Sequence, residues 1–283
     1  MSDQDNVRRI APARLNTARD LAHKAVQLVT KAARANLTPA PDDSHSNLGW
    51  DRKRGAFLSQ PIMDKNGTTF IGFAISGFEL IVIRDGHEIA TRNLAGVADA
   101  DASGWLDTQL TDIGLEPTGS TTLPYDLPAS AGRIDIYTVD GVAEDLAVLA
   151  SWYMLADEVL TASAEKLTHL HPGPSAVRCW PHHFDIATYV SLEEGDFETA
   201  RGIGVGMSPG DGTYGEPYFY VNPWPHLSPD TLPQLPAPGH WHTQDFVGAI
   251  ATASEVLSLS DVDKELPHFA DAAIAIGRTM LGA

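Results

Sequence analysis

Two turn dipeptides, Asn66-Gly67 and Asp85-Gly86, each separate short runs of strand-forming residues, and this feature limits the possible folds most strongly. Tight two-residue hairpins prefer Asn-Gly and Asp-Gly because both residues adopt positive φ angles there. The flanking runs predict four short strands, at 56–61, 68–75, 78–84 and 87–93. Strands joined by such turns are antiparallel, so strict β-α-β alternation is excluded and an α+β fold is predicted.

The rest of the chain repeats a layout in which strands come in runs and helices follow them. Apolar residues at helical spacing predict five helices, at 11–35, 100–113, 142–167, 244–257 and 261–281. Further strands are predicted at 133–139, 176–180, 184–191, 202–207 and 218–221. The fold class is therefore α+β, with antiparallel sheets, flanking helices and two similar β-rich halves.

Pro172, Gly173 and Pro174 prevent the helix predicted at 142–167 from continuing and give the best internal boundary. The expected organisation is an N-terminal helix and linker over 1–46, a first α+β half over 47–170 and a second over 171–283. One continuous domain remains the alternative, because 283 residues suit either arrangement.

The charge of the chain is strongly acidic and unevenly distributed. The formal net charge is -18, although residues 1–55 hold ten Lys/Arg against six Asp/Glu. Such an acidic surface argues against nucleic acid or an anionic membrane as a partner. The basic N-terminal segment is either an ordinary solvated helix or docks on acidic residues of this chain or of a second copy, which would make a homo-oligomer.

The start of the chain and its cysteine content predict a cytoplasmic location. Residues 1–5 are polar and acidic and lack the basic start and apolar stretch of a secretory signal. Cys179 is the single cysteine, which excludes an internal disulfide framework and a zinc site built from cysteines.

Histidine is concentrated in the second half: eight of the eleven histidines lie between His169 and His268. Two tight clusters stand out, Trp180-Pro181-His182-His183-Phe184-Asp185 and His240-Trp241-His242. In an extended chain His183 and Asp185 share one face, as do His240 and His242. Thr243 would cap the helix predicted after it. These residues predict a divalent metal site, for zinc or iron, with the ligands His183, Asp185, His240 and His242, or a subset with Glu216.

The segment Glu216 to Tyr220 adds groups that alternate onto one face: Glu216, Tyr218 and Tyr220. Glu216 is expected to act as general base towards a metal-bound water, and His182 and Tyr218 are the other candidate catalytic residues. Trp180, Tyr220 and Trp241 are expected to line a small-molecule pocket. Three interpretations stay open at this point: a metal site, a metal-free polar pocket, and purely structural roles for these side chains.

Glycine occupies alternate positions in the run Gly202-Ile203-Gly204-Val205-Gly206. The spacing is G-x-G-x-G on a predicted strand, so it does not match the strand-turn-helix of a dinucleotide-binding motif. Glycine at every second position instead leaves room for an aromatic ring or a ligand against the sheet. No nucleophile elbow or phosphate-binding loop occurs in the sequence.

Three segments resemble the uncharacterised bacterial family called domain of unknown function 5996. They are 72–83, from Gly72-Phe73 to Ile83; 179–187, which contains Cys179-Trp180 and Phe184-Asp185-Ile186-Ala187; and 216–221, Glu-Pro-Tyr-Phe-Tyr-Val. The resemblance extends from about Leu48 to the C-terminal helices. It implies a soluble, mostly bacterial protein and supplies no catalytic residues. Smaller residues often stand in that family where this chain has Pro181-His182-His183, which implies that the histidine pair belongs to a subgroup.

Together these features predict a small-molecule enzyme, either a metal-dependent hydrolase or a lyase, with a His/Asp/Glu and aromatic pocket. The alternative is a non-catalytic protein, either a small-molecule binder or an oligomeric scaffold, in which the same side chains form core or interface. Both hypotheses place the informative residues between 180 and 243.

Overall fold

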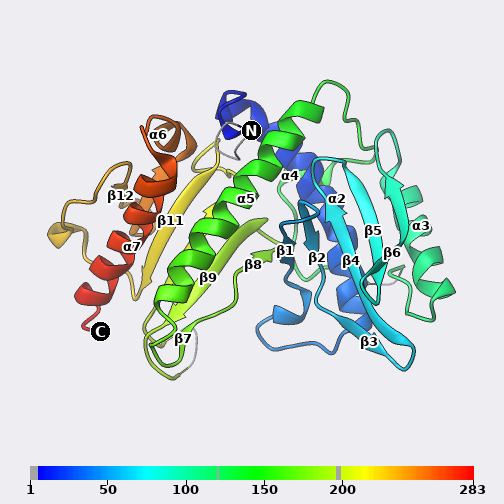
Figure 1. Cartoon of the computed structure of the whole chain (residues 1–283), viewed down its shortest axis with the longest axis horizontal. Helices are drawn as coiled ribbons and strands as arrows, with labels where there is room; N and C mark the ends of the chain where they lie inside the picture. The colour runs from blue at the N-terminus through cyan, green and yellow to red at the C-terminus, as the bar shows by residue number, and fades with distance from the viewer. Residues whose placement is uncertain (1–5, 120, 196–198) are drawn as a thin grey trace. The chain divides into compact units, whose positions relative to one another are not determined.

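The computed structural model describes residues 6–119, 121–195 and 199–283, so residues 1–5, which carried the prediction about location, lie outside the described part. The chain forms two compact units, each assembled from separate segments (Figure 1). The N-terminal unit comprises Arg14–Ala150 and Cys179–Phe184. The C-terminal unit comprises Met1–Ala13, Ser151–Arg178 and Asp185–Ala283.

The N-terminal unit is built on an antiparallel sheet with the strand order β1-β2-β4-β5-β6, and β3 pairs with β4. Its strands are β1 (Gly49–Asp51), β2 (Ala56–Leu58), β3 (Ile62–Asp64), β4 (Gly67–Ala74), β5 (Glu79–Arg84) and β6 (His87–Asn93). The turns at Asn66-Gly67 and Asp85-Gly86 connect neighbouring strands as predicted, and Gly67, Asp85 and Gly86 have positive φ angles. The local turn chemistry therefore sets the register of this sheet.

Helices flank this sheet. They are α2 (Asn16–Asn36), α3 (Asp99–Asp112), the short α4 (Ala129–Gly132) and the first part of α5 (Ala143–Lys166), with 3₁₀ turns at Pro12–Leu15 and Ser44–Ser46. Helix α2 packs against β4 and buries the apolar stripe that its sequence predicts, including Leu21, Val26 and Val29.

The C-terminal unit is built on a second antiparallel sheet with the order β12-β13-β11-β10-β9-β7, and β8 pairs with β9. Its strands are β7 (Gly173–Pro174), β9 (Asp185–Ser191), β10 (Gly202–Ser208), β11 (Tyr218–Trp224), β12 (His240–His242) and β13 (Gly248–Thr252). Of β8 (Arg178–Trp180), only Arg178 belongs to this unit, because Cys179 and Trp180 belong to the N-terminal unit. The helices that follow are α6 (Ala253–Leu257) and α7 (Val262–Met280), and a 3₁₀ turn lies at Pro229–Thr231.

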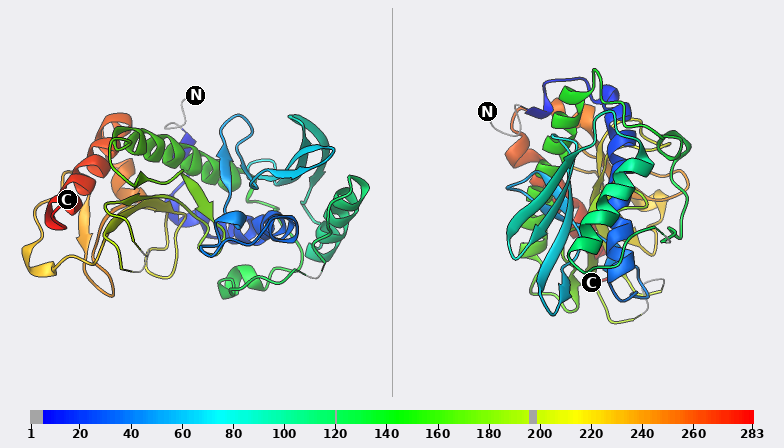
Figure 2. Two further views of the ribbon diagram at one scale, coloured as in Figure 1. Left: turned by 90° about the horizontal axis from the view of Figure 1, so that it is seen from below. Right: turned by 90° about the vertical axis from the view of Figure 1, so that its right-hand side faces the viewer.

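One face of the second sheet is covered by helices. Helix α7 packs on β10 and β11, and Gly277 of α7 lies close to Ile203 and Pro223. The left view of Figure 2 shows α7 and the second part of α5 on the same side of these strands. Asp271 of α7 accepts hydrogen bonds from Ser163 and Lys166 of α5, which ties the two helices together. The opposite face of the sheet is therefore not covered by α7 or by the second part of α5.

The fold class is confirmed as α+β with two antiparallel sheets, but two predicted elements are wrong. Residues 133–139 form no strand: Ile136 makes only an isolated bridge with Ala98, and its side chain is 56% exposed. The helix predicted at 244–257 begins only at Ala253, because 248–252 is the strand β13. Thr243 is accordingly not a helix cap, and Thr252 takes that role.

Strand β13 was misread because all five of its residues are buried, so its sequence shows no alternation of polar and apolar positions. No helix in the described ranges is both long and apolar enough to cross a membrane.

Candidate functional site

The second sheet presents a polar face on the side away from α7. Ala187, Gly206, Tyr220, Ile250 and His240 lie opposite one another on successive strands, so their side chains share this face. The polar side chains of this surface, called the polar face below, include Asp185, Tyr189, Ser208, Tyr218, Tyr220, Asn222, His240, His242 and Thr252. Alternate positions such as Val205, Met207 and Val221 are apolar and buried on the α7 side.

Two glycines of β10 make room for tyrosine rings on this face. A Cβ atom on Gly206 would lie 2.5 Å from Cζ of Tyr220, and one on Gly202 would lie 2.5 Å from Cε1 of Tyr189. The expectation that alternate glycines leave space for aromatic rings is thus confirmed. The rings that fill the space belong to the neighbouring strands β9 and β11.

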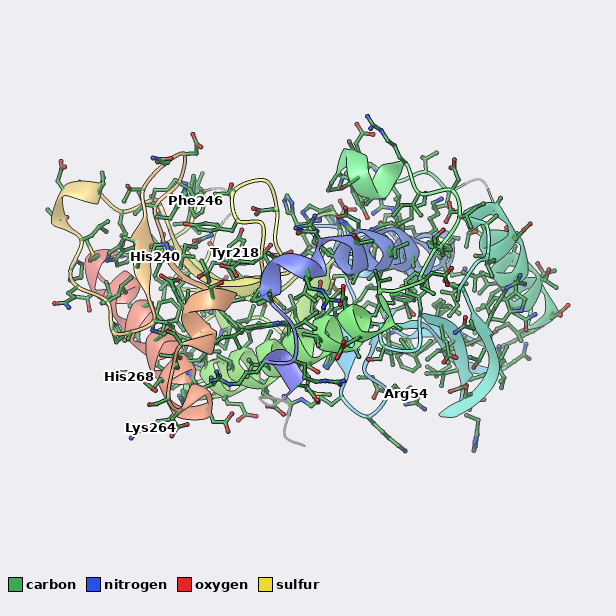
Figure 3. All side chains as sticks on the ribbon, turned by 90° about the horizontal axis from the view of Figure 1, so that it is seen from above. Arg54, Tyr218, His240, Phe246, Lys264 and His268 are labelled. Atoms are coloured by element: carbon green, nitrogen blue, oxygen red, sulfur yellow. The ribbon has the colours of Figure 1, made fainter. Side chains whose placement is uncertain are left out.

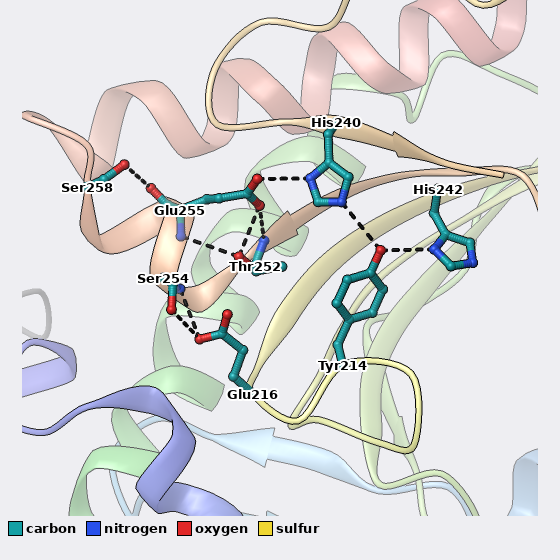
Figure 4. Close-up of polar contacts among 8 residues, drawn as sticks. All are labelled: Tyr214, Glu216, His240, His242, Thr252, Ser254, Glu255 and Ser258. Atoms are coloured by element: carbon teal, nitrogen blue, oxygen red, sulfur yellow. Dashed lines mark hydrogen bonds and ion pairs between the residues drawn. The ribbon is translucent and has the colours of Figure 1, made fainter. Parts of the chain in front are cut away.

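Tyr214 meets both histidines of β12. Its phenol oxygen Oη lies 2.9 Å from Nδ1 of His242 and 3.3 Å from Nε2 of His240 (Figure 4). The histidines can converge because β12 is extended, so residues two apart point to the same side, as the sequence predicts. Tyr214, His240 and His242 are called the tyrosine–histidine centre below.

In each histidine, the ring nitrogen that points away from Tyr214, called the outer nitrogen, faces an oxygen acceptor. The nitrogen that faces Tyr214 is called the inner nitrogen. Nδ1 of His240 lies 2.9 Å from Oε1 of Glu255, and Nε2 of His242 donates to the backbone carbonyl of Gln244. A carbonyl or carboxylate oxygen can only accept, so both outer nitrogens carry a hydrogen. In the neutral imidazoles the inner nitrogens, which face Tyr214, are therefore acceptors.

Glu255 is fixed by the start of α6. Thr252 and Glu255 form a capping box, in which the Thr252 hydroxyl accepts from the Glu255 amide and the Glu255 carboxylate accepts from the Thr252 amide at 2.8 Å. The side chains of His240 and Glu255 remain 40% and 37% exposed. The pair is thus held in place and open to solvent.

Asp211 holds the loop that carries Tyr214. One carboxylate oxygen accepts from the amides of Thr213 and Tyr214 at 2.8 and 3.0 Å, and the other accepts from the Tyr218 hydroxyl at 2.7 Å. The Tyr214 and Tyr218 rings pack with centroids 4.9 Å apart. Burial, together with the charges of Glu255 and Asp211, raises the pKa of Tyr214, and burial beside Asp211 raises that of Tyr218.

Phe246 covers the far side of the tyrosine–histidine centre, because its ring stacks on His242 with centroids 4.3 Å apart. In Figure 3 Tyr218, His240 and Phe246 lie together, whereas Lys264 and His268 lie apart on α7. His268 is therefore not part of this site.

The other predicted site residues of this unit take different positions. Glu216 accepts from the amide and hydroxyl of Ser254 at 3.2 and 2.6 Å, at the first turn of α6. Tyr220 donates to Asp185 across the polar face. Trp241 points to the other side of β12 from the two histidines, and its indole donates to the carbonyl of Pro233.

His182 and His183 lie in a turn of the N-terminal unit. The amide of Phe184 donates to the carbonyl of Trp180 at 2.8 Å and Phe184 has a φ of 60°, so the chain does not run extended from His183 to Asp185. The bend expected at Pro181 is confirmed, and the shared strand face of His183 and Asp185 is not found. Burial and the neighbouring His183 lower the pKa of His182 to about 4.

Helix α2 holds this turn. His23 and Gln27 both donate to the carbonyl of Pro181 at 2.9 Å, and the His23 ring stacks on Phe184. Burial lowers the pKa of His23 to about 4. The Trp180 and His182 rings are 6.3 Å apart, so Trp180, predicted as a pocket wall, belongs to this histidine cluster.

Within the described ranges, no three or more His, Cys, Asp and Glu side chains are grouped so that they could hold a metal ion. Of the four predicted ligands, the structure brings His240 and His242 together, and the side chains that they contact by hydrogen bonds are those of Tyr214 and Glu255. Tyr214 lies in the stretch 180–243 that the sequence singled out but was given no role there, and Glu255 was missed. The motif Thr252-x-x-Glu255 could have located Glu255, since it is a capping-box signature.

No family model matches the chain, and neither the curated proteins nor the solved structures contain a match to it. The resemblance to domain of unknown function 5996 therefore stays a prediction.

Proposed function

We propose that this protein is a small-molecule enzyme, a hydrolase or lyase, whose acid–base chemistry takes place at the tyrosine–histidine centre. The observation that supports this most directly is the hydrogen-bonded series from Tyr214 through His240 to Glu255. A hydroxyl, an imidazole and a carboxylate in series can move a proton to or from a reacting group, because the carboxylate orients the imidazole and stabilises its charged form.

In the proposed step Tyr214 is the general acid. In hydrolysis, water attacks the carbonyl carbon, the bond to the leaving oxygen breaks, and the Tyr214 hydroxyl proton passes to that oxygen. The attacking water loses a proton to solvent, and a protonated His240 returns a proton to the phenolate oxygen of Tyr214 through Nε2. Glu255 stabilises the imidazolium until that transfer, and solvent reloads His240 afterwards. The partial exposure of His240 and Glu255 is compatible with both access and reloading.

The charge around the site favours a neutral or cationic substrate. Residues 185–257 contain ten Asp/Glu, one arginine (Arg201) and no lysine. Arg201 is already engaged by Glu193 and by the carbonyl of Leu281. Apart from the protonated His240 of the proposed step, a phosphate or carboxylate substrate would find no cationic partner among these residues.

Hydrolysis of ethyl acetate, a small neutral ester whose alkoxide leaving group needs a proton, tests the proposal. Tyr214→Phe removes the reactive hydroxyl and keeps the ring, so the rate is expected to fall by roughly 10²- to 10⁴-fold, the usual contribution of a general acid. His240→Gln is expected to give a similar loss. His226→Gln, which changes an exposed histidine outside the centre, serves as the control. Equal rates for the wild type and Tyr214→Phe would refute the proposal.

The non-catalytic alternative, a ligand-binding or scaffold protein, is favoured by one specific observation. Tyr220, a predicted pocket wall, packs over Gly206 of its own sheet, as Tyr189 packs over Gly202. If the tyrosine–histidine centre is likewise only structural, Tyr214→Phe will lower the melting temperature and leave ester hydrolysis at the control level. Thermal unfolding and the hydrolysis assay on the same samples separate the two functions.

A further inference from the structure

We propose that Tyr214, His240 and His242 bind one divalent transition-metal ion, with zinc as the ion used to test it. This site differs from the set expected from the sequence, because the phenol oxygen of Tyr214 takes the place of His183 and Asp185. The inference rests on the proposed function only for what the ion would do, since binding itself is measured without turnover.

The distances from the Tyr214 oxygen to the two imidazole nitrogens fit ligands that share one ion. Oη of Tyr214 lies 2.9 Å from Nδ1 of His242 and 3.3 Å from Nε2 of His240. Ligand atoms about 2.0–2.1 Å from a tetrahedral ion lie roughly 3.3 Å from one another. The three side chains would have to turn from one another towards the ion to bind it.

The outer partners of the histidines match those of metal-binding imidazoles. Such histidines donate their second ring N–H to a carboxylate or a backbone carbonyl, which fixes the ring and makes the other nitrogen a better ligand. His240 has Glu255 in this role, and His242 has the carbonyl of Gln244. Both inner nitrogens are thereby left with lone pairs directed at the same point.

A metal ion would replace the single phenol hydrogen that faces the two inner nitrogens. The two inner lone pairs face a phenol that has one hydrogen to donate, so one pair has no hydrogen bond from Tyr214 while both imidazoles are neutral. A metal ion accepts both lone pairs and a phenolate oxygen. The balanced exchange is that the ion binds, the Tyr214 O–H bond breaks and one proton leaves to solvent.

The donor set indicates the class of ion. Two imidazoles suit zinc, iron, copper and nickel, whereas magnesium and calcium prefer oxygen ligands alone. Three protein ligands leave a position for water, and a bound water whose pKa the ion lowers is the nucleophile that a hydrolase needs. With the ion bound, Nε2 of His240 and the Tyr214 oxygen are ligands and carry no proton, so the metal-bound water would replace the acid–base route proposed above.

Isothermal titration of the metal-stripped, full-length protein with zinc chloride tests the site. One zinc ion per chain is expected. His240→Ala, His242→Ala and Tyr214→Phe should each weaken binding more than Glu255→Gln, because loss of an outer partner typically costs about 10- to 100-fold in affinity. His226→Ala is the matched control and should bind as the wild type does.

Proton release gives a second readout that a structural role for Tyr214 would not produce. Titrations in buffers of different ionisation enthalpy should show about one proton more released per zinc ion by the wild type than by Tyr214→Phe, because phenylalanine has no phenol to ionise. Circular dichroism verifies that each variant is folded, and His242→Gln replaces any alanine variant that is not.

Zinc binding below one equivalent, or binding that none of the three ligand variants weakens, overturns the metal site. If zinc does not bind while ester hydrolysis still depends on Tyr214, the proposed function stands without the metal. If zinc binds with the expected variant effects and no ester hydrolysis is found, the metal site stands and the proposed function fails.

Discussion

Tyr220 packs over Gly206 so closely that a Cβ atom on the glycine would lie 2.5 Å from Cζ of the tyrosine and 2.8 Å from the carbonyl oxygen of Ile186. Gly206→Ala must therefore displace Tyr220 or the β9 backbone. We expect unfolding free energy to fall by about 1–3 kcal/mol, the usual cost of overpacking. Urea denaturation measures the change.

Gly204→Ala provides the matched control for that substitution. Gly204 lies on the same strand and the same face, and the nearest atom to its Cβ would be the carbonyl oxygen of Asn222 at 3.8 Å, an ordinary contact. This variant should retain nearly the stability of the wild type. If both substitutions lowered the unfolding free energy equally, the loss would come from replacing any glycine of this strand and not from the space that Tyr220 needs.

The stability of the N-terminal unit should fall in mild acid because His23 is held neutral. Burial lowers its pKa from 6.5 to about 4, against the opposing influence of Asp20 and together with the charges of Arg19 and His183. Below pH 6.5 the unfolded chain gains a proton that the folded His23 does not take up until about pH 4. The contribution lost between pH 7 and pH 4 is about 3 kcal/mol, at 1.36 kcal/mol per pKa unit.

Urea denaturation at pH 7 and at pH 4.5 measures this effect. His23→Gln should lose much less stability between the two pH values than the wild type, although it is less stable at pH 7 because the bond to Pro181 changes. His87→Gln is the control, since His87 is an exposed histidine of the same unit. An unchanged pH dependence in His23→Gln would contradict the assignment of acid sensitivity to His23.

Thr252→Ala should weaken both α6 and the tyrosine–histidine centre. The substitution removes the hydroxyl that accepts from the Glu255 amide and donates to its carboxylate at 3.0 Å. Loss of an N-cap costs about 1 kcal/mol, and Glu255 becomes less well oriented towards His240. Thermal unfolding and zinc titration should both show the change. Thr252→Ser keeps the hydroxyl and should behave as the wild type; a similar loss in both variants would exclude the hydroxyl as the cause.

Asp211→Ala should release the loop that positions Tyr214. The substitution removes the acceptor of two loop amides and of the Tyr218 hydroxyl. Zinc affinity and ester hydrolysis are expected to fall roughly 10- to 100-fold, as for other supporting residues of metal sites. Asp211→Asn keeps one carbonyl oxygen for the loop amides and should lose less. Wild-type affinity in Asp211→Ala would show that the loop is held by other contacts.

Local signals in the sequence were sufficient for most of the fold. The hairpins at Gly67 and Gly86 follow from turn chemistry alone, and the apolar stripe of α2 follows from helical periodicity. Strand β13 could not be found in this way, since a strand buried on both faces between β11 and β12 has no alternating pattern.

The site was predictable only where its members are neighbours in the chain. His240 and His242 share a face because they are two residues apart on a strand. Tyr214 reaches His240 from 26 residues away, through a loop whose path depends on Asp211. His183 and Asp185 were grouped wrongly because closeness in the sequence does not ensure a shared face. The tight turn that ends at Phe184 separates these two residues, although they are only two positions apart.

The interleaving of the two units has a consequence for the order in which they can form during synthesis. The N-terminal unit needs residues 179–184, so it is incomplete until the whole of α5 has left the ribosome. The C-terminal unit includes the first segment of the chain, where Arg8 donates to the carbonyls of Leu257 and Leu259. The N-terminal segment can therefore form these hydrogen bonds only after α6 and Leu259 have been synthesised. A nascent chain halted after Phe184 has left the ribosome, but before Leu259 has, should protect α2 from protease while the bond between Arg8 and Leu259 has yet to form.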